Sequence, residues 1–371
     1  MSKWQNNLNT FWRNGLNTFW KNAKFVAPTP PPKPGVFDML LVEFTINGTL
    51  NRLSNENLAL AHEWKQKVMT FTAPKYIMRQ RYGGYVESSF GQINFFPDLF
   101  DGDWPPPTSG ELAIKYTSST EASAEVLFNG TAYIDKIDRK KITYNIFGPT
   151  FSTTVGASTA FSATTLNAAM ATLTGASQLN LTLDTTLARN PSPTINHTTS
   201  KEQLSIDLAS GFCEYLNHLF YIKDTTGDGV LDTLYLVDLQ LDNGTRTATE
   251  FDFFPSTYKY NKAFSLVRDS VNGYISQTSF PFGSEISVFP YDTNQTNIEN
   301  ALDDIRDTLL KPRRTLKIPL EGDLPEPGEQ ITDIDESQAV STTMVFNSRN
   351  LTYDFDKEVI TVEGEGIISA T

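Results

Sequence analysis

Cysteine and histidine are scarce in this sequence. Among 371 residues there is one cysteine, Cys213, and there are three histidines, His62, His197 and His218. A single cysteine excludes an intrachain disulfide and a cysteine-rich zinc site, and the histidines stand too far apart to form a zinc set by spacing. Cys213 lies in an apolar pattern with helical spacing, which predicts a buried, unreactive thiol. Such sparing use of cysteine is typical of proteins made in a reducing compartment.

Long apolar runs and catalytic motifs are also missing. No run approaches the ~18 apolar residues of a membrane-spanning helix, and the N-terminal MSKWQNNLNTFWRN lacks the apolar core of a signal peptide. No GxSxG, Walker loop, HExxH or dinucleotide fingerprint occurs. Paired glycosidase carboxylates have no fixed local spacing, so the motif search leaves that chemistry open. We expect a protein that is not an enzyme.

Basic residues are in the minority, 30 against 43 acidic ones, which gives a net charge of −13. This balance argues against specific nucleic-acid recognition, which needs a basic face. From Glu321 onward, 12 acidic residues stand against only Arg349 and Lys357. This acidity predicts either a solvated face or an acidic lining or partner surface. The apolar fraction of 39 % and the aromatic fraction of 12 % exclude a disordered protein.

The N-terminal segment carries a direct repeat, NLNTFWRN at 7–14 and GLNTFWKN at 15–22. Its apolar residues have the spacing of an amphipathic helix: Trp4, Leu8, Phe11, Trp12, Leu16, Phe19 and Trp20. Its charged residues are all basic: Lys3, Arg13, Lys21 and Lys24. A proline-rich linker follows at 28–34 and favours an extended chain. This arm is predicted to dock on a partner protein, to pack on its own body, or to contact a membrane interface.

The remaining sequence predicts a mainly β protein with an α/β insert. We expect two β-barrel domains flanking a small α+β domain, preceded by the amphipathic arm. The predicted boundaries are 1–35 for the arm and linker, 36–150 for the first β-barrel, 151–235 for the α/β domain, and 236–371 for the second β-barrel with a helical insertion near 297–311.

Local signals support this order. Asn47-Gly48 and Asn129-Gly130 are both typical of tight hairpin turns between strands. Thr164–Thr174 predicts a helix that ends at Gly175. Ser200-Lys201-Glu202-Gln203 has the pattern of a capping box that opens a second helix.

The segment from Asp224 to Asp232 has the spacing of part of a calcium loop. An EF-type loop places oxygen ligands at positions 1, 3, 5, 7 and 9, glycine at 6 and a bidentate acid at 12. The ligand positions fall on Asp224, Thr226, Asp228, the Val230 carbonyl and Asp232. Position 12, however, is Tyr235, and the segment joins two predicted strands. A β-hairpin turn rich in aspartate and glycine is the alternative, and calcium is the one cofactor predicted.

Three stretches carry a resemblance to a known family. They are Ser88–Phe100, SSFGQINFFPDLF, with Asp103-Trp104 after it; Leu166–Ile222; and Pro327–Ile331, PGEQI. The first resembles the first-domain pattern of the tail or baseplate hub proteins of tailed bacteriophages, the second resembles their middle domain, and the third resembles the loop that opens a strand of their second barrel. The likeness covers residues 36–371 by architecture and diffuse pattern, and the N-terminal repeat lies outside it.

The resemblance implies a structural virion protein without catalytic residues. Such hubs are trimers whose two barrels per subunit make a pseudo-sixfold ring. The ring joins a hexameric tail tube to a threefold tail tip and lines the channel for DNA and the tape-measure protein. Implied partners are the tail tube or distal tail protein, the tape-measure protein, and tail-tip fibre or spike proteins. The implied location is the virion tail tip, after synthesis in the bacterial host cytoplasm.

Two other functions stay open at this point. A receptor- or glycan-binding tail-tip adhesin would use aromatic turns such as Tyr82–Tyr85 to stack on sugars, although buried hairpin aromatics are the alternative for these residues. A cell-wall hydrolase appended to a tail would need a compact acidic or His/Cys site, and the sequence shows none.

Overall fold

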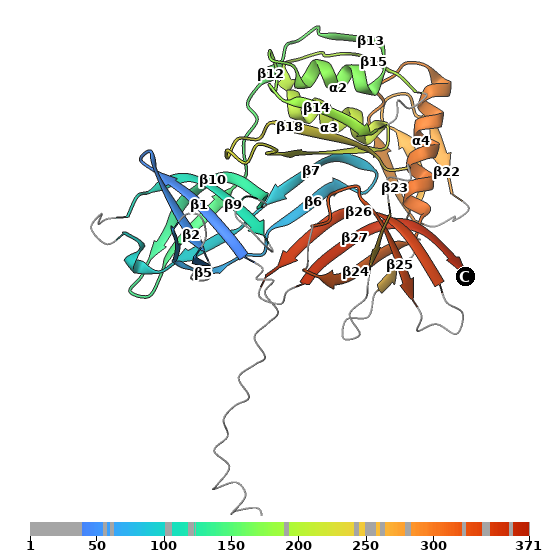
Figure 1. Cartoon of the computed structure of the whole chain (residues 1–371). Helices are drawn as coiled ribbons and strands as arrows, with labels where there is room; N and C mark the ends of the chain where they lie inside the picture. The colour runs from blue at the N-terminus through green and yellow to red at the C-terminus, as the bar shows by residue number, and fades with distance from the viewer. Residues whose placement is uncertain are drawn as a thin grey trace, which may run out of the picture. The chain divides into compact units, whose positions relative to one another are not determined.

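Strands make up most of the chain that the structure describes (Figure 1). The computed structural model describes residues 39–54, 58–59, 63–100, 106–117, 122, 124–188, 193–240, 245–248, 257–259, 264–278, 283–320, 324–335, 342–355 and 359–370. These residues include three α-helices, α2 (Leu166–Thr174), α3 (Ser205–Tyr215) and α4 (Gln295–Leu310), and the 3-10 helix η1 (Pro97–Phe100). The prediction of a mainly β protein is confirmed. The predicted arm and linker, 1–35, lie outside the described residues.

A nine-stranded sheet is formed by the first segment of the chain. Its strands run in the order β3 (Leu58–Ala59), β4 (Glu63–Gln66), β2 (Thr49–Ser54), β1 (Met39–Ile46), β9 (Ser109–Thr117), β10 (Glu125–Ile137), β11 (Ile142–Phe147), β8 (Gln92–Phe95) and β5 (Val68–Phe71). The sheet curls around one apolar core, because Phe44 of β1 stacks on Phe95 of β8 with ring centroids 5.6 Å apart although three strands lie between them.

An eleven-stranded sheet joins all three predicted segments of the body. Its main order is β14 (Thr182–Leu187), β18 (Thr233–Asp238), β17 (His218–Lys223), β7 (Gly83–Ser89), β6 (Lys75–Gln80), β26 (Thr342–Asp354), β27 (Val359–Ala370), β24 (Arg313–Pro319) and β20 (Thr257–Lys259). β25 (Gln330–Asp335) pairs with β26, and β19 (Thr245–Ala248) pairs with β25. Figure 1 shows β7 and β6 between β18 and β26.

Small sheets and helices complete the described structure. The two-stranded sheets are β12 (Thr154–Val155) with β16 (Gln203–Leu204), and β13 (Ala160–Thr164) with β15 (Ile195–Thr198). A three-stranded sheet runs in the order β22 (Ile275–Gln277), β21 (Phe264–Asp269) and β23 (Ser284–Val288). Helix α3 packs on β7 and β17, α2 packs on α3, and α4 packs on β21 and β22. Among the described residues no sheet closes into a barrel, so the two-barrel arrangement stays a prediction.

The two Asn-Gly pairs behave differently, and one hairpin prediction is wrong. Asn47 and Gly48 take φ values of 49° and 77°, which suit a tight turn, and β1 and β2 pair across them. Asn129 and Gly130 instead lie inside the continuous strand β10, because β9 pairs alongside both of them. A Cβ at Gly130 would lie 2.1 Å from the Phe147 carbonyl oxygen, so the glycine allows a close approach of neighbouring strands.

The helices lie near their predicted positions, but the capping box is wrong. The Thr165 and Asn294 side chains accept hydrogen bonds from Ala168 N and Asn297 N, and so cap α2 and α4. Helix α3 begins at Ser205, after Leu204, which provides no side-chain cap. Glu202 of the predicted box instead accepts a hydrogen bond from the Thr154 hydroxyl at 2.5 Å, beside the β12–β16 pairing. The contact of Glu202 with the distant Thr154 therefore takes the place of the local cap that the sequence predicted.

The Tyr82–Tyr85 segment is a buried junction. Tyr82 is buried, and Tyr85 is half-buried and stacks on Phe220 with ring centroids 5.1 Å apart, so both rings pack against the protein's own core. Gly83 has φ +147°, and a Cβ there would lie 2.5 Å from the His218 carbonyl oxygen and 2.7 Å from that of Cys213. Only glycine lets the start of β7 approach α3 and β17 this closely.

We expect Gly83→Ala to destabilise the protein more than Gly48→Ala. A methyl group at Gly83 meets backbone atoms as well as positive-φ strain, for an expected loss of about 2–5 kcal/mol. Gly48 also has a positive φ, +77°, but nothing lies within 4 Å of a built Cβ, so strain alone predicts a loss of about 1–2 kcal/mol. Urea denaturation followed by circular dichroism gives both values. Equal losses would contradict the close approach at Gly83.

Candidate functional site at the seam between the sheets

The predicted calcium loop connects β17 to β18, and its carboxylates bind backbone amides. The Asp224 carboxylate is buried and accepts hydrogen bonds from Gly227 N at 2.6 Å and Gly229 N at 2.7 Å. Asp232 accepts from the amide and hydroxyl of Thr225, and Asp228 accepts from Val230 N. These bonds are those of an aspartate-rich turn.

The five predicted ligand residues differ strongly in exposure. Asp224 is 3 % exposed, whereas Val230 is 63 % exposed. In the part of the chain that the structure describes, no group of three or more His, Cys, Asp or Glu side chains is placed to hold a metal ion. Although burial alone would raise the pKa of Asp232, hydrogen bonds from Thr233, Thr225 and Thr226 lower it below its ordinary value. Calcium binding stays a prediction.

The same loop docks on the nine-stranded sheet. The Asn129 amide of β10 donates to Asp224 Oδ2 at 3.3 Å, and the Lys115 ammonium of β9 donates to the Gly227 carbonyl at 2.8 Å. Lys115 also pairs with Glu43 of β1 at 2.9 Å. Asp224 therefore organises its own loop and also anchors that loop to the first sheet, a role that the sequence did not reveal because Asn129 was expected in a turn.

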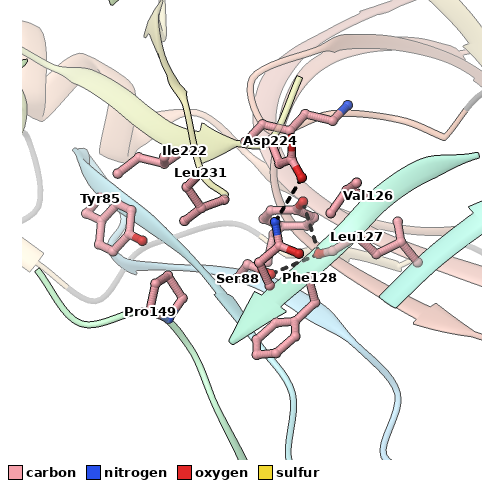
Figure 2. A pocket seen from close by; sticks show the side chains of 12 residues that line it. Tyr85, Ser88, Val126, Leu127, Phe128, Pro149, Ile222, Asp224 and Leu231 are labelled. Atoms are coloured by element: carbon pink, nitrogen blue, oxygen red, sulfur yellow. Dashed lines mark hydrogen bonds between the residues drawn. The ribbon is translucent and has the colours of Figure 1, made fainter. Parts of the chain in front are cut away.

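A small cavity lies at this seam. Figure 2 shows Tyr85 and Ser88 of β7, Leu127 and Phe128 of β10, and Asp224 around it. Its volume is about 20 Å³, which is room for about one water molecule. Binding pockets for small substrates are usually several hundred Å³ in size, so this space suits packing between sheets better than substrate binding.

A second polar group joins β17 to the loop before β25. Lys223 forms an ion pair with Glu326, and the Tyr221 hydroxyl donates to Glu326 Oε2 at 2.6 Å. Burial alone would lower the pKa of Lys223, but the Glu326 carboxylate raises it. Burial also raises the pKa of the neighbouring Tyr76 to about 12. The loop Pro327–Ile331, which resembles the strand-opening loop of hub proteins, therefore begins beside the Glu326 carboxylate, which Tyr221 and Lys223 hold in place.

A third polar group is centred on Glu365 of β27. Its carboxylate contacts Arg81, after β6, at 2.5 Å and Arg349 of β26 at 2.9 Å, and both Glu365 and Arg349 are buried. Burial alone would raise the pKa of Glu365, but the two guanidinium groups lower it. Glu363 pairs with Arg313 nearby at 2.6 Å. Part of the acidity after Glu321 is therefore neutralised inside the fold.

The other predicted site residues lie away from the Asp224–Asp232 loop or outside the residues that the structure describes. Trp4, Leu8, Phe11, Trp12, Leu16, Phe19 and Trp20 fall outside the described residues. Cys213 is buried, as expected, and burial raises the pKa of its thiol. None of the helices in the described ranges is long and apolar enough to cross a membrane.

Asp224→Ala and Asp228→Ala distinguish a turn from a calcium loop. In the turn, Asp224 accepts two short amide hydrogen bonds in a buried position, and its loss costs about 2–3 kcal/mol. Asp228 accepts one bond at an exposed site, so we expect a loss of about 0.5 kcal/mol. Thermal unfolding with calcium and with EDTA measures both. A calcium site would instead show stabilisation by the ion that either substitution removes.

Glu365→Gln tests the buried ion cluster. Removing the charge leaves two guanidinium groups without their carboxylate, so we expect a loss of about 3–5 kcal/mol at neutral pH. The lowered pKa of Glu365 means that its ionisation stabilises the fold above the ordinary value of 4.5, and this stability is lost as the pH falls through the folded-state pKa. Urea denaturation between pH 3 and 7 should show a shallower acid limb in the variant.

Glu87→Gln provides the matched control. Its partner Arg79 is 75 % exposed in its side chain, and such pairs contribute about 0–1 kcal/mol. A Glu365→Gln loss no larger than the control would contradict a structural role for the cluster.

Comparison with solved structures shows which fold this arrangement belongs to. The chain is similar to the tail protein from Neisseria meningitidis MC58, with a TM-score of 0.52 and 10 % identity over 89 % of this chain and 96 % of that one. It is also similar to the 43 kDa tail protein of prophage MuSo2 from Shewanella oneidensis, with a TM-score of 0.51 and 10 % identity over 88 % and 96 % of the two chains. No protein-family model and no curated protein matches the sequence. The chain therefore shares its fold with these two tail proteins.

Proposed function

We propose that this protein is a structural component of a tailed-phage or prophage tail, and that it forms the hub ring at the tail tip. The observation that carries the proposal is the shared fold, which extends over nearly the whole of this chain and of two tail proteins. The proposed hub is a homotrimer that joins a hexameric tail tube to a threefold tip. Its two β-rich parts act as the two barrels of each subunit, so three copies present six similar units.

Polar contacts between distant segments of the chain support a mechanical role. Asn129–Asp224, Lys223–Glu326 and Arg81–Glu365–Arg349 each join segments far apart in sequence. The cavity beside Asn129 and Asp224 is too small for a typical substrate. A ring that transmits force along a tail needs this kind of fixed geometry. The proposed partners are a tail tube or distal tail protein, a tape-measure protein and a tip fibre or spike. The proposed role is structural and needs no enzymatic activity.

Residues 1–27 are the proposed contact with a neighbouring subunit. The seven apolar residues of the arm's stripe would each contribute roughly 1.5–3 kcal/mol when fully covered. The arm's basic residues would be attracted to an acidic partner surface. Contact with a membrane interface is the alternative role for the same sequence.

A tail-tip adhesin is the second candidate, because two aromatic rings lie exposed together on the first sheet. Tyr133 and Phe147 are 50 % and 53 % exposed, with ring centroids 5.7 Å apart. Gln92, Asn145 and Asp135 form a hydrogen-bonded row beside them. Binding of purified protein to host-cell polysaccharide, lost in Tyr133→Ser/Phe147→Ser, would favour this candidate.

Reconstruction of particles tests the hub directly. We expect three copies on the tail axis at the distal end, and we expect deletion of the gene to leave particles without complete tails. Deletion of residues 1–27 alone should give a folded protein that fails to enter particles. Density in the capsid or on a side fibre, or normal infectivity of the truncated form, would contradict the proposal.

A further inference from the structure

A second small cavity lies beside the ion cluster that is centred on Glu365. Its volume is about 20 Å³, as for the cavity in Figure 2. The charged side chains that line it are Arg81, Arg313, Arg349, Glu363 and Glu365. Three guanidinium groups against two carboxylates leave this lining with one excess positive charge.

The strand register brings these charges to one face of the central sheet. Glu363 and Glu365 are two residues apart on β27, so their side chains point to the same face. Arg313 of β24 pairs with Glu365 and shares that face, whereas the next residue, Arg314, points to the opposite one. The carboxylates and Arg313 therefore meet on a single surface of β24 and β27.

A β-bulge supplies the buried arginine of the lining. The register of β26 against β27 shifts between Ser348 and Asn350, so Arg349 is the extra residue of the bulge. Its Nη1 lies 2.9 Å from Glu365 Oε2. Arg349 is 3 % exposed, yet its Nε has no hydrogen-bond partner among the described residues. Because a buried donor without an acceptor is costly, this guanidinium favours an acceptor in the cavity that it lines.

The guanidinium groups around the cavity also repel one another. Burial lowers the pKa of Arg349, Glu365 raises it, and the charges of Arg81 and Arg313 lower it again. Each carboxylate already accepts from an arginine, Glu365 from Arg81 and Glu363 from Arg313. An anion in the cavity would relieve the remaining repulsion.

Charged groups just outside the lining do not offset its excess. Lys311 lies near Arg349, because burial and the Arg349 charge both lower the Lys311 pKa, while nearby carboxylates that include Asp238 and Asp307 raise it. Asp307 is paired with Arg306. Lys311 and Asp238 then contribute one charge of each sign, so the local balance stays positive.

We propose that this cavity binds a chloride ion. A monovalent anion cancels one excess positive charge, and guanidinium N–H groups are donors that such an ion can accept from. The volume admits about one water molecule, and chloride is only slightly larger, whereas phosphate and sulfate carry several oxygen atoms and need more room. Water would fit but would leave the excess charge in place.

The bound ion would join three parts of the central sheet. Arg81 follows β6, Arg349 belongs to β26 and Arg313 to β24. Arg81 and Arg313 are partly exposed, so solvent ions can reach their side of the cavity. Chloride would therefore stabilise the junction between the β6–β7 hairpin and the C-terminal strands. The inference does not depend on the proposed tail role.

Thermal unfolding of the full protein at constant ionic strength separates ion binding from charge screening. Sodium chloride is exchanged stepwise for sodium gluconate, whose anion is too large for the cavity. A ligand that binds only the folded state raises the Tm as its concentration increases, so we expect the Tm to rise with the chloride fraction. Bromide should replace chloride, and crystals soaked in bromide should give an anomalous peak between Arg81, Arg313 and Arg349.

Two substitutions change the charge of the lining in opposite directions. Arg313→Gln removes the excess positive charge and should raise the dissociation constant of chloride by about tenfold, while Glu363→Gln increases the excess and should lower that constant by about tenfold. Effects of opposite sign cannot arise from a common loss of stability. Arg268→Gln is the matched control, because Arg268 pairs with Glu285 and does not line the cavity. It should keep the wild-type response to chloride.

Several outcomes would overturn the chloride site. Equal Tm values in chloride and gluconate would do so, as would a bromide soak without an anomalous peak in the cavity, which would indicate water there. Weaker chloride binding by Glu363→Gln, or loss of the response in Arg268→Gln, would also contradict it. If Arg313→Gln fails to fold, the bromide peak and the Glu363→Gln variant still decide. Reconstruction of particles tests the tail role separately, so either proposal can fail while the other stands.

Discussion

The insertion of the β6–β7 hairpin into the central sheet is the constraint on which the rest of the structure depends. β7 pairs with β17 through Gly84 and Tyr85, and β6 pairs with β26 through Lys75 and Tyr76. Without this hairpin the central sheet would separate into a part from the middle of the chain and a part from its end. One apolar cluster spans the junction and takes residues from all three segments. The hairpin therefore sets the position of the nine-stranded sheet, whose strands are continuous with it along the chain.

Charges buried at this junction specify the arrangement more than they stabilise it. Removing an ion pair such as Arg349–Glu365 from water costs several kcal/mol per ion, and the mutual attraction roughly compensates that cost only in the correct geometry. Lys223–Glu326 and the buried Asp224 impose similar conditions on the loops that they join. A misaligned junction would leave an unpaired charge inside the protein, so these groups penalise alternative arrangements. The same pairing neutralises part of the C-terminal acidity, which leaves fewer unpaired acidic charges at the surface.

Local patterns predicted the element types well, and tertiary contacts account for the errors. Alternating apolar residues and Asn47-Gly48 identified strands and a true hairpin, because that turn depends only on its own dihedral angles. Asn129-Gly130 has the same two residue types, but its pairing with β9 keeps both residues inside one continuous strand, β10. The capping box failed because Glu202 binds Thr154, which lies 48 residues away. The Asp224 loop was recognisable as a turn, yet its anchoring by Asn129 and Lys115 was not, because no local spacing records which strand lies opposite.

Rigidity and surface charge together determine what such a fold can assemble. At 10 % identity to two tail proteins, the shared feature is the layer arrangement and not a set of side chains. In the proposed hub ring, the fixed geometry within one subunit would determine how many copies complete a turn. A flexible seam would permit rings of several sizes or open chains. In such a ring, a net charge of −13 makes identical acidic surfaces repel each other, so copies can associate only where apolar or oppositely charged groups meet.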